Sequence, residues 1–230
     1  MNNYKHHIVF LTGAGISQES GITTFRDQNG LWENHSIEEV ASPEGFAKNP
    51  QLVLDFYNAR RKQLDEVYPN EAHILIARLE KKYKVTVITQ NIDDLHESAG
   101  SSNVLHVHGE LNKCRSSIDE NLVYPYNDAL KIGDLATDGS QLRPNVVWFG
   151  EEVTNIEKAI KITQSADLFI IVGTTMQVHP AASLLLAVPV NAQTVYIDTN
   201  PDVEDGINLL VIKEKATVGL KLLVEEYLPY

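Results

Sequence analysis

The stretch Ile8-Val9-Phe10-Leu11-Thr12-Gly13-Ala14-Gly15-Ile16-Ser17 decides the fold of this chain. Its first four residues are apolar and partly β-branched, which predicts a short buried strand that ends at Gly13. Two glycines directly after such a strand let the backbone come close to a pyrophosphate and turn its N–H groups toward it. Gln18 stands where the dinucleotide fingerprint has its third glycine, so a tight strand-to-helix turn is the alternative interpretation.

Five further apolar runs of strand length follow, at residues 85–89, 104–108, 168–172, 194–197 and 209–212. Because the runs show almost no alternation of polar and apolar residues, they suit a parallel sheet that is covered on both faces. Apolar residues at helical spacing occupy the stretches between them, at residues 71–83, 156–166, 181–187 and 218–228. Strands and helices in alternation predict a doubly wound, Rossmann-like α/β fold.

Two segments interrupt this alternation. Residues 30–68 have helical patterning without a strand signal and predict a helical insertion. Residues 112–141 are polar and rich in turn formers, which predicts a long loop or a small lobe. The chain, residues 1–230, is therefore interpreted as one catalytic domain, in which residues 1–29, 69–111 and 142–230 form the Rossmann-like part.

The bulk composition excludes some classes of function. The chain has 230 residues and a formal net charge of −12, and its acidic residues are dispersed. Tight binding to nucleic acid needs clustered basic residues, so we expect no nucleic-acid partner. Dispersed acidity suits basic protein substrates, but it also suits plain solubility. No apolar run approaches the ~20 residues that span a bilayer, and the polar start does not resemble a signal peptide, so we expect a cytoplasmic protein without membrane contact.

Five sequence blocks carry a family resemblance. They are Gly13-Ala14-Gly15-Ile16-Ser17 with Phe25-Arg26, Gln90-Asn91-Ile92-Asp93, His106-Val107-His108-Gly109, Val146-Val147-Trp148-Phe149-Gly150-Glu151, and Gly173-Thr174-Thr175 with Val178. In order and spacing they resemble the motifs of the sirtuins, the NAD-dependent protein deacylases. The resemblance runs from near the start of the chain to beyond residue 200. Thr175 stands where the family usually has serine, and the hydroxyl is kept.

The resemblance implies NAD as the cofactor and proteins with acylated lysines as substrates. The reaction breaks the bond between nicotinamide and ribose, and water must be excluded while the acyl-lysine oxygen attacks. By resemblance Phe25 shields the reacting ribose carbon, while Asn91 and Asp93 hydrogen-bond the ribose and the carboxamide. A helix cap is the alternative for Asn91, and a turn before Pro201 is the alternative for Asn200. The implied cofactor-binding residues are Gly13, Ala14, Gly15, Ile16, Phe25, Arg26, Gln90, Asn91, Ile92, Asp93, Gly173, Thr174, Thr175 and Asn200.

His108 is the candidate general base. A histidine suits proton transfer at neutral pH because its ordinary pKa is about 6.5. By resemblance it takes a proton from a ribose hydroxyl, with Asn91 and Asp93 as the other catalytic residues. We expect His96 and His106 to be packed or hydrogen-bonded neighbours rather than catalytic groups.

The chain departs from many sirtuins in its cysteines. Those proteins carry two cysteine pairs in the segment that corresponds to residues 112–141, whereas this chain has Cys114 alone. A single cysteine cannot build a four-cysteine or Cys₂His₂ zinc site. We therefore expect a reduced lobe without metal, which is held by other packing or is mobile.

Tyr57 and Arg60 are the second departure. They lie three residues apart, hence on one helix face. The bacterial and mitochondrial desuccinylase-type branch has this pair facing the acyl pocket, where arginine binds a carboxylate with two hydrogen bonds. A solvated helix face is the alternative, since Arg61 and Lys62 follow. The implied substrate-binding residues are Tyr57, Arg60, Val146, Phe149, Gly150, Glu151 and Val178.

Together these patterns predict an NAD-dependent protein-lysine deacylase, acting on acetyl or succinyl groups, that forms nicotinamide, lysine and 2′-O-acyl-ADP-ribose. One alternative is an ADP-ribosyltransferase or NAD glycohydrolase, which the presence of His108 disfavours. A non-catalytic NAD-sensing module is another, and it predicts the loss of His108 or Asn91. The sequence does not predict the oligomeric state.

Overall fold

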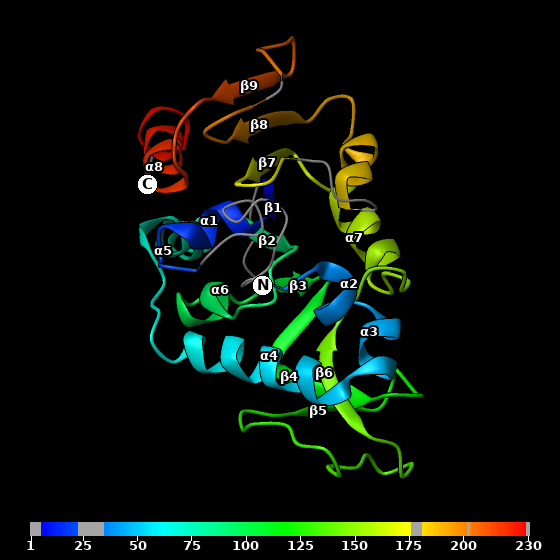
Figure 1. Ribbon diagram of the computed structural model, residues 1–230. Coiled ribbons are helices and arrows are strands. Elements are labelled where there is room, and N and C mark those ends of the chain that lie inside the picture. The colour runs from blue at the N-terminus through cyan, green and yellow to red at the C-terminus, as the bar shows by residue number, and fades with distance from the viewer. Residues whose placement is uncertain (1–5, 23–34, 176–180, 202, 229–230) are drawn as a thin grey trace.

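The computed structural model describes residues 6–22, 35–175, 181–201 and 203–228, with the backbone alone for residues 181 and 182. Its main sheet has six parallel strands in the order β3-β2-β1-β7-β8-β9 (Figure 1). The strands are β1 His7–Thr12, β2 Lys84–Thr89, β3 Val104–His106, β7 Leu168–Val172, β8 Gln193–Ile197 and β9 Leu209–Ile212. All six predicted strands are present, and the predicted doubly wound α/β fold is confirmed.

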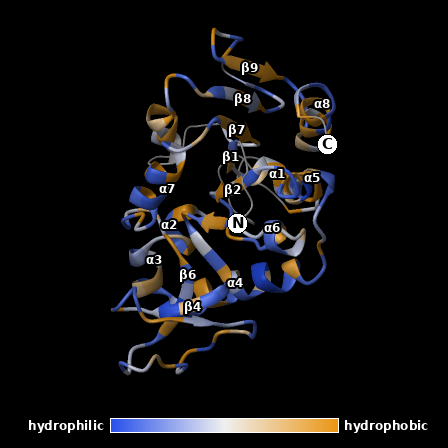
Figure 2. Ribbon diagram, turned by 180° about the vertical axis from the view of Figure 1, so that it is seen from behind, coloured by the Kyte–Doolittle hydropathy of each residue, from blue (hydrophilic) through white to orange (hydrophobic). Residues whose placement is uncertain are grey.

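Helices cover both faces of this sheet. Ile8 and Phe10 of β1 pack on one side with helices α5 (Glu71–Leu79) and α8 (Ala216–Tyr227). Val9 and Leu11 pack on the other side with α7 (Ile156–Thr163) and the 3₁₀ helix η1 (Ala181–Ala187). Because both faces of β1 are buried, its central residues Ile8 to Leu11 are all apolar. The covering helices mix hydrophilic and hydrophobic residues (Figure 2). Two short helices, α1 (Ala14–Gln18) and α6 (Leu95–Ser98), follow β1 and β2.

The predicted helical insertion consists of α2 (Ile37–Val40), α3 (Pro43–Lys48) and α4 (Pro50–Leu64) over its described part. Local sequence fixes where these helices begin. The Ser42 hydroxyl accepts a hydrogen bond from Gly45 N, and the Asn49 side chain accepts one from Leu52 N. A proline follows each of these capping residues, in the helix position where no N–H is needed.

The small lobe is a three-stranded antiparallel sheet in the order β5-β4-β6. Its strands are β4 Gly109–Ser116, β5 Val123–Pro125 and β6 Leu142–Val146, and α4 packs against it. The sheet extends past both ends of the polar segment 112–141. At its start Gly109 has a φ of 84°, and its Cα lies too close to Asn145 to carry a side chain, so the chain turns here from β3 into β4.

Packing and hydrogen bonds hold the lobe together. Cys114 is fully buried in an apolar cluster with Leu54, Leu130, Ala136 and Leu142. The Ser116 hydroxyl donates to Asp138 Oδ2 over 2.6 Å. Arg61 Nε donates to Leu111 O over 2.8 Å and ties α4 to the lobe. No group of three or more potential metal ligands occurs among the described residues, so the side chains of this lobe do not fit a structural zinc ion.

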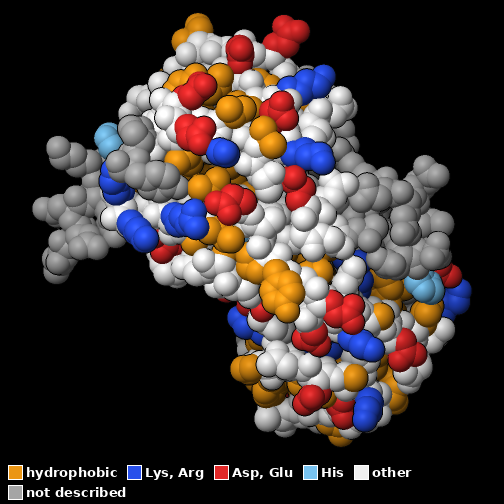
Figure 3. Space-filling model, turned by 90° about the vertical axis from the view of Figure 1, so that its left-hand side faces the viewer, with side chains coloured by type: hydrophobic (Ala, Val, Ile, Leu, Met, Phe, Trp, Pro, Cys, Tyr) orange, Lys and Arg blue, Asp and Glu red, His pale blue; other side chains and the backbone are white. Residues whose placement is uncertain are grey.

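The surface agrees with the dispersed charge of the sequence. Figure 3 shows a molecule that narrows between a larger and a smaller body, with acidic and basic side chains interspersed over this face. None of the described helices is both long enough and apolar enough to cross a bilayer.

Candidate functional site

The two glycine loops meet at the carboxyl edge of the main sheet. Gly15 N donates to Gly173 O over 2.9 Å, which joins the loop after β1 to the loop after β7. A Cβ at position 15 would lie 2.7 Å from the Cα of Gly173, and Gly173 itself has a φ of 62°. The glycines therefore allow two backbones to touch. Strand order reverses direction between β1 and β7, which is where ligands bind in doubly wound sheets.

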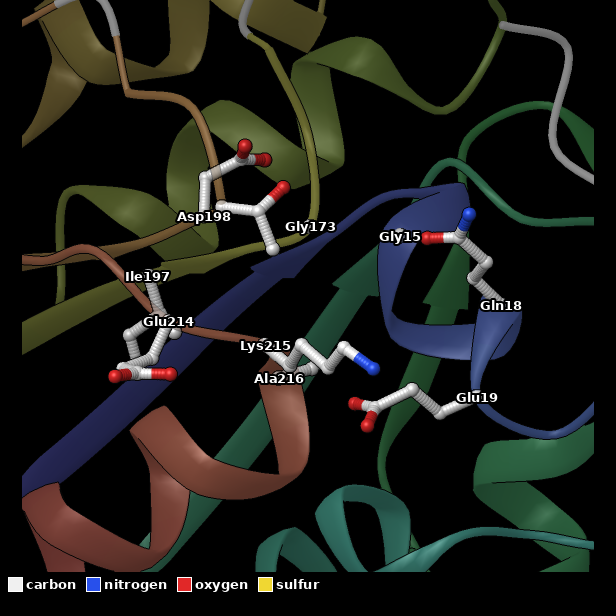
Figure 4. Close-up of a pocket in the computed structure, with 10 residues that line it drawn as sticks. Gly15, Gln18, Glu19, Gly173, Ile197, Asp198, Glu214, Lys215 and Ala216 are labelled. Atoms are coloured by element: carbon white, nitrogen blue, oxygen red, sulfur yellow. The ribbon is translucent and has the colours of Figure 1, made fainter. Parts of the chain in front are cut away.

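A pocket of about 290 Å³ opens beside these loops (Figure 4). Its lining residues are Gly15, Gln18, Glu19, Gly173, Ile197, Asp198, Thr199, Glu214, Lys215 and Ala216. Three carboxylates and one lysine give it an acidic character. Carboxylates accept hydrogen bonds from sugar hydroxyls, so this donor and acceptor set fits the neutral adenosine end of a dinucleotide rather than its phosphates.

Asp198 directly follows strand β8 and lines this pocket, whereas Asn200 does not. Asn200 is exposed, and its backbone N–H donates to Asp198 Oδ1 over 2.9 Å. The predicted ribose contact of Asn200 thus remains untested, and Asp198 is the neighbouring residue that lines the pocket. The position after a parallel strand was the signal that could have identified it.

Ser17, Asn91 and Asp93 form a buried polar cluster next to the glycine loops. Asn91 Nδ2 donates to Gly13 O and to Ser17 Oγ, each over 3.1 Å. The Ser17 hydroxyl in turn donates to Asp93 Oδ2 over 3.0 Å. Burial raises the pKa of Asp93. Helix α6 has Asp94 as its N-cap, so the alternative of Asn91 as a helix cap is wrong. Ser17 belongs to the first sequence motif, but the motif alone does not assign it a place in the site.

His108 lies between β3, which ends at His106, and β4, which begins at Gly109. Its Nδ1 is 3.0 Å from Gln90 O, and because a carbonyl only accepts, Nδ1 carries the proton. Nε2 is then the basic nitrogen. Burial lowers the pKa of His108, although the bond to Gln90 opposes that shift. The backbone O of His108 accepts from Val147 N over 2.9 Å, so His108 is attached to the segment that directly follows β6.

The two neighbouring histidines have structural contacts, as predicted. His106 Nε2 pairs with Glu97 Oε1 over 2.9 Å, and its Nδ1 contacts Asn91 O over 2.8 Å. Burial opposes a charge on His106, but the contacts with Glu97 outweigh it and raise the pKa. His96 is fully buried, with Nε2 at 3.0 Å from Thr12 Oγ1. His108 is the one of the three that is only partly buried, and it stays the candidate for proton transfer.

The predicted substrate segment begins in β6 and continues into an exposed loop. Phe149 is 55% exposed, and Phe149 N donates to Ala41 O over 2.9 Å, which links the loop to the helical insertion. Gly150 has a φ of 90° and turns the chain. Exposure and an apolar ring suit Phe149 to contact an extended peptide.

Val146 and Glu151 have different positions from Phe149. Val146 is buried in the apolar cluster around Trp148. The Glu151 carboxylate accepts from Arg115, Arg143 and Trp148 N, and burial, which would raise its pKa, is outweighed by Arg143, which lowers it. Both residues hold the loop in place, and direct substrate contact by either stays a prediction.

Tyr57 and Arg60 are buried on α4, with 0% and 7% exposure. The alternative of a solvated helix face is therefore wrong. The phenolic oxygen of Tyr57 accepts from Trp148 Nε1 over 3.0 Å, and burial raises the pKa of Tyr57. An arginine beside a buried tyrosine suits recognition of an anionic group.

The remaining predicted residues are placed as follows. Gln90 Nε2 donates to Thr174 Oγ1 over 3.1 Å, which joins the second motif to the late glycine loop, and Thr175 follows in that loop. Ile16 is fully buried and Ile92 packs in the cluster around Trp148, whereas Ala14 is exposed. Phe25, Arg26 and Val178 lie outside the described residues.

Comparison with known proteins is consistent with this geometry. A model of the Sir2 family matches residues 13–180. An NAD-dependent protein deacylase of Helicobacter pylori is 60% identical over 192 residues, which are 84% of each chain. A Sir2 homologue solved with NAD is 39% identical, with a TM-score of 0.84 over 95% of this chain and 88% of that one. A mutant Sir2 homologue solved with 2′-O-acetyl-ADP-ribose is 39% identical, with a TM-score of 0.84 over 95% of this chain and 90% of its own.

Proposed function

This chain belongs to the Sir2 family, and from that premise we propose how it works as an NAD-dependent protein deacylase. NAD supplies the ribose that receives the acyl group, and nicotinamide and the deacylated lysine are the other products. The observation that carries the proposal is His108, whose proton lies on Nδ1 against Gln90 O and whose Nε2 is the basic nitrogen.

His108 Nε2 accepts a proton from a ribose hydroxyl, so that the oxygen can attack the acyl carbon. The lowered pKa keeps His108 neutral, and therefore basic, at physiological pH. The contact between Val147 N and His108 O keeps the base beside the predicted substrate segment, residues 146–151. These contacts fix the base before substrate arrives, which lowers the cost of orientation.

Ser17, Asn91 and Asp93 hold the nicotinamide end of NAD in this proposal. Their mutual hydrogen bonds fix the Asn91 amide and the Asp93 carboxyl in one arrangement. Because the pKa of Asp93 is raised, its carboxyl protonates more readily than an exposed one and suits a carboxamide partner. At the other end Asp198 accepts hydrogen bonds from adenosine ribose hydroxyls.

The acylated lysine contacts the wall that Phe149 and the helical insertion form together, and Tyr57 with Arg60 lies beside the acyl group. This placement favours acyl groups that end in a carboxylate. A matched set of acetyl-, succinyl- and crotonyl-lysine peptides, incubated with the protein and NAD and analysed by mass spectrometry, tests the proposal. Loss of the acyl mass with stoichiometric nicotinamide release is expected.

Three other results would each identify a different function. Nicotinamide release without deacylation would identify an NAD glycohydrolase, and a peptide heavier by ADP-ribose would identify a transferase. NAD binding without any reaction would identify a sensing module. His108 in the arrangement of a base disfavours all three, because none of them needs a base at that position.

A further inference from the structure

A second cleft lies at the opposite edge of the main sheet from the glycine loops. It is formed where strands β1, β2 and β3 begin, and helix α7 makes its other wall. Its volume is about 420 Å³, which falls in the range of pockets that hold small molecules. The nicotinamide chemistry proposed above does not use this cleft.

The charge of the cleft is opposite to that of the whole chain. Lys84, Lys158 and Lys161 are among its lining residues, and no aspartate or glutamate is. The chain has 31 acidic residues against 19 lysines and arginines. Lys158 and Lys161 are three apart on α7 and therefore lie on one side of it. Within the described ranges no carboxylate lies within 4.0 Å of any of these three lysines.

The floor of the cleft is polar, and hydrogen bonds hold its side chains in place. His7 is 7% exposed, its Nδ1 is 3.1 Å from Ser165 Oγ, and its Nε2 is 2.9 Å from Thr86 Oγ1. These contacts hold the ring in one orientation. Leu105 and Ile162 supply an apolar wall beside it.

Two carboxylates lie near the lining residues, but they accept hydrogen bonds from groups other than the three lysines. Asp167 Oδ2 accepts from His7 N over 2.7 Å, and the Glu80 carboxylate accepts from Ser102 N and Oγ over 2.8 and 2.6 Å. Neither forms an ion pair with a lysine of the cleft. The positive charge of the three lysines is therefore not neutralised by these carboxylates, and an anionic ligand can neutralise it.

We propose that this cleft binds a small molecule with two or more linked phosphate groups. The three ammonium groups contact phosphate oxygens as point charges, which is how lysine recognises phosphate. The apolar wall of Leu105 and Ile162 accepts the remainder of a nucleotide. A site at the amino edge of β1 and β2 does not overlap the adenosine pocket at their carboxyl edge.

Isothermal titration calorimetry with inorganic tripolyphosphate and with ATP tests the proposal at physiological salt. ADP-ribose is added at saturation so that ATP cannot report on the adenosine pocket. Tripolyphosphate should bind the wild-type chain. A triple variant with Lys84→Gln, Lys158→Gln and Lys161→Gln should bind it about tenfold to a hundredfold less tightly. This range assumes a loss of affinity of about two- to fivefold for each exposed lysine that is removed. Tighter binding of ATP would identify a nucleotide as the source of the phosphates, and equal binding would identify a free polyphosphate.

Lys131→Gln is the matched control, because it removes the same charge from an exposed lysine of the small lobe. Its affinity for tripolyphosphate should equal that of the wild-type chain. Equal affinity in the triple variant, or no binding at roughly 10 mM tripolyphosphate, would overturn the proposal. Melting curves that coincide for the three proteins show that the exposed substitutions leave the fold intact. Deacylation of an acetyl-lysine peptide is measured in parallel, so that a failure of the proposed function is seen separately.

Discussion

The indole Nε1 of Trp148 donates a 3.0 Å hydrogen bond to the phenolic oxygen of Tyr57. Both rings are buried, and the residues are 91 positions apart in sequence. The Arg143 guanidinium lies 3.2 Å from the centre of the Trp148 ring and is held by Glu151. Because of these contacts the helical insertion and the substrate segment form one rigid wall beside the proposed acyl site.

The first prediction concerns the base. His108→Ala should reduce deacylation by at least about a hundredfold, which is the usual contribution of a general base, while NAD binding persists. The fold should remain intact, as measured by circular dichroism. Because the pKa of His108 is lowered, the acid limb of kcat/KM in the wild-type enzyme should lie below pH 6.5. Deacylation near the wild-type rate in a folded His108→Ala variant would contradict the assignment.

The strands of the main sheet could be predicted because each contains a short, mostly apolar run without regular polar alternation. The boundary of the small lobe could not, because β4 and β6 include polar residues such as Asn112 and Arg143. Arg143 is buried and paired with Glu151, so its place in a strand depends on a partner that a local pattern does not show. Likewise His108 was placed in a strand, but β3 ends at His106.

The part of the site whose residues lie in a single sequence motif could be predicted. Gln90, Asn91 and Asp93 lie in one stretch, and the structure brings Asn91 and Asp93 to Ser17. The acidic side of the pocket was not predicted, because Asp198, Glu19 and Glu214 come from three separate segments. Only the fold brings such residues together.

The second prediction concerns acid stability. His73 is fully buried, its ring lies 4.9 Å from that of His96, and burial lowers its pKa to about 4. An unfolded histidine titrates near 6.5, so the unfolded chain binds the extra proton first. The free energy of unfolding should therefore decrease as the pH falls below about 6.5 and level off below about 4, with roughly 2 kcal/mol lost at pH 5.

His73→Leu should remove this part of the pH dependence, measured by urea unfolding at pH 8 and pH 5. His6→Gln is the control, because His6 is exposed. It should keep the wild-type slope. If His73→Leu kept that slope as well, the buried ring would not be the cause.

The third prediction concerns metal. Because Cys114 lies in an apolar cluster, the purified chain should contain no stoichiometric zinc, and chelators should leave its activity unchanged. Cys114→Ala should lower the free energy of unfolding by about 1 kcal/mol without loss of deacylation. About one zinc per chain by elemental analysis would refute the expectation.

The fourth prediction concerns the choice of dinucleotide. A 2′-phosphate on the adenosine ribose would lie beside Asp198, Glu19 and Glu214, so NADP should be a poor substrate. Asp198→Ser should lower the ratio of kcat/KM for NAD to that for NADP by about tenfold. Glu204→Ser, an exposed residue outside the pocket, is the control and should leave the ratio unchanged. An unchanged ratio in Asp198→Ser would exclude Asp198 from this selection.

The last prediction concerns the acyl group. Arg60 is buried one helical turn from Tyr57, and a guanidinium in such a place gains a two-pronged, charge-assisted hydrogen bond from a terminal carboxylate. Arg60→Met keeps the length of the side chain and removes the charge. Desuccinylation should fall by about ten- to a hundredfold, as expected for a bond of this kind, while deacetylation changes little. Arg78→Met is the control, because Arg78 lies on α5 with its side chain 52% exposed, and it should affect neither activity. Equal loss of both activities in Arg60→Met would mean that Arg60 holds α4 in place, and no loss of either would mean that it does not contact the acyl group.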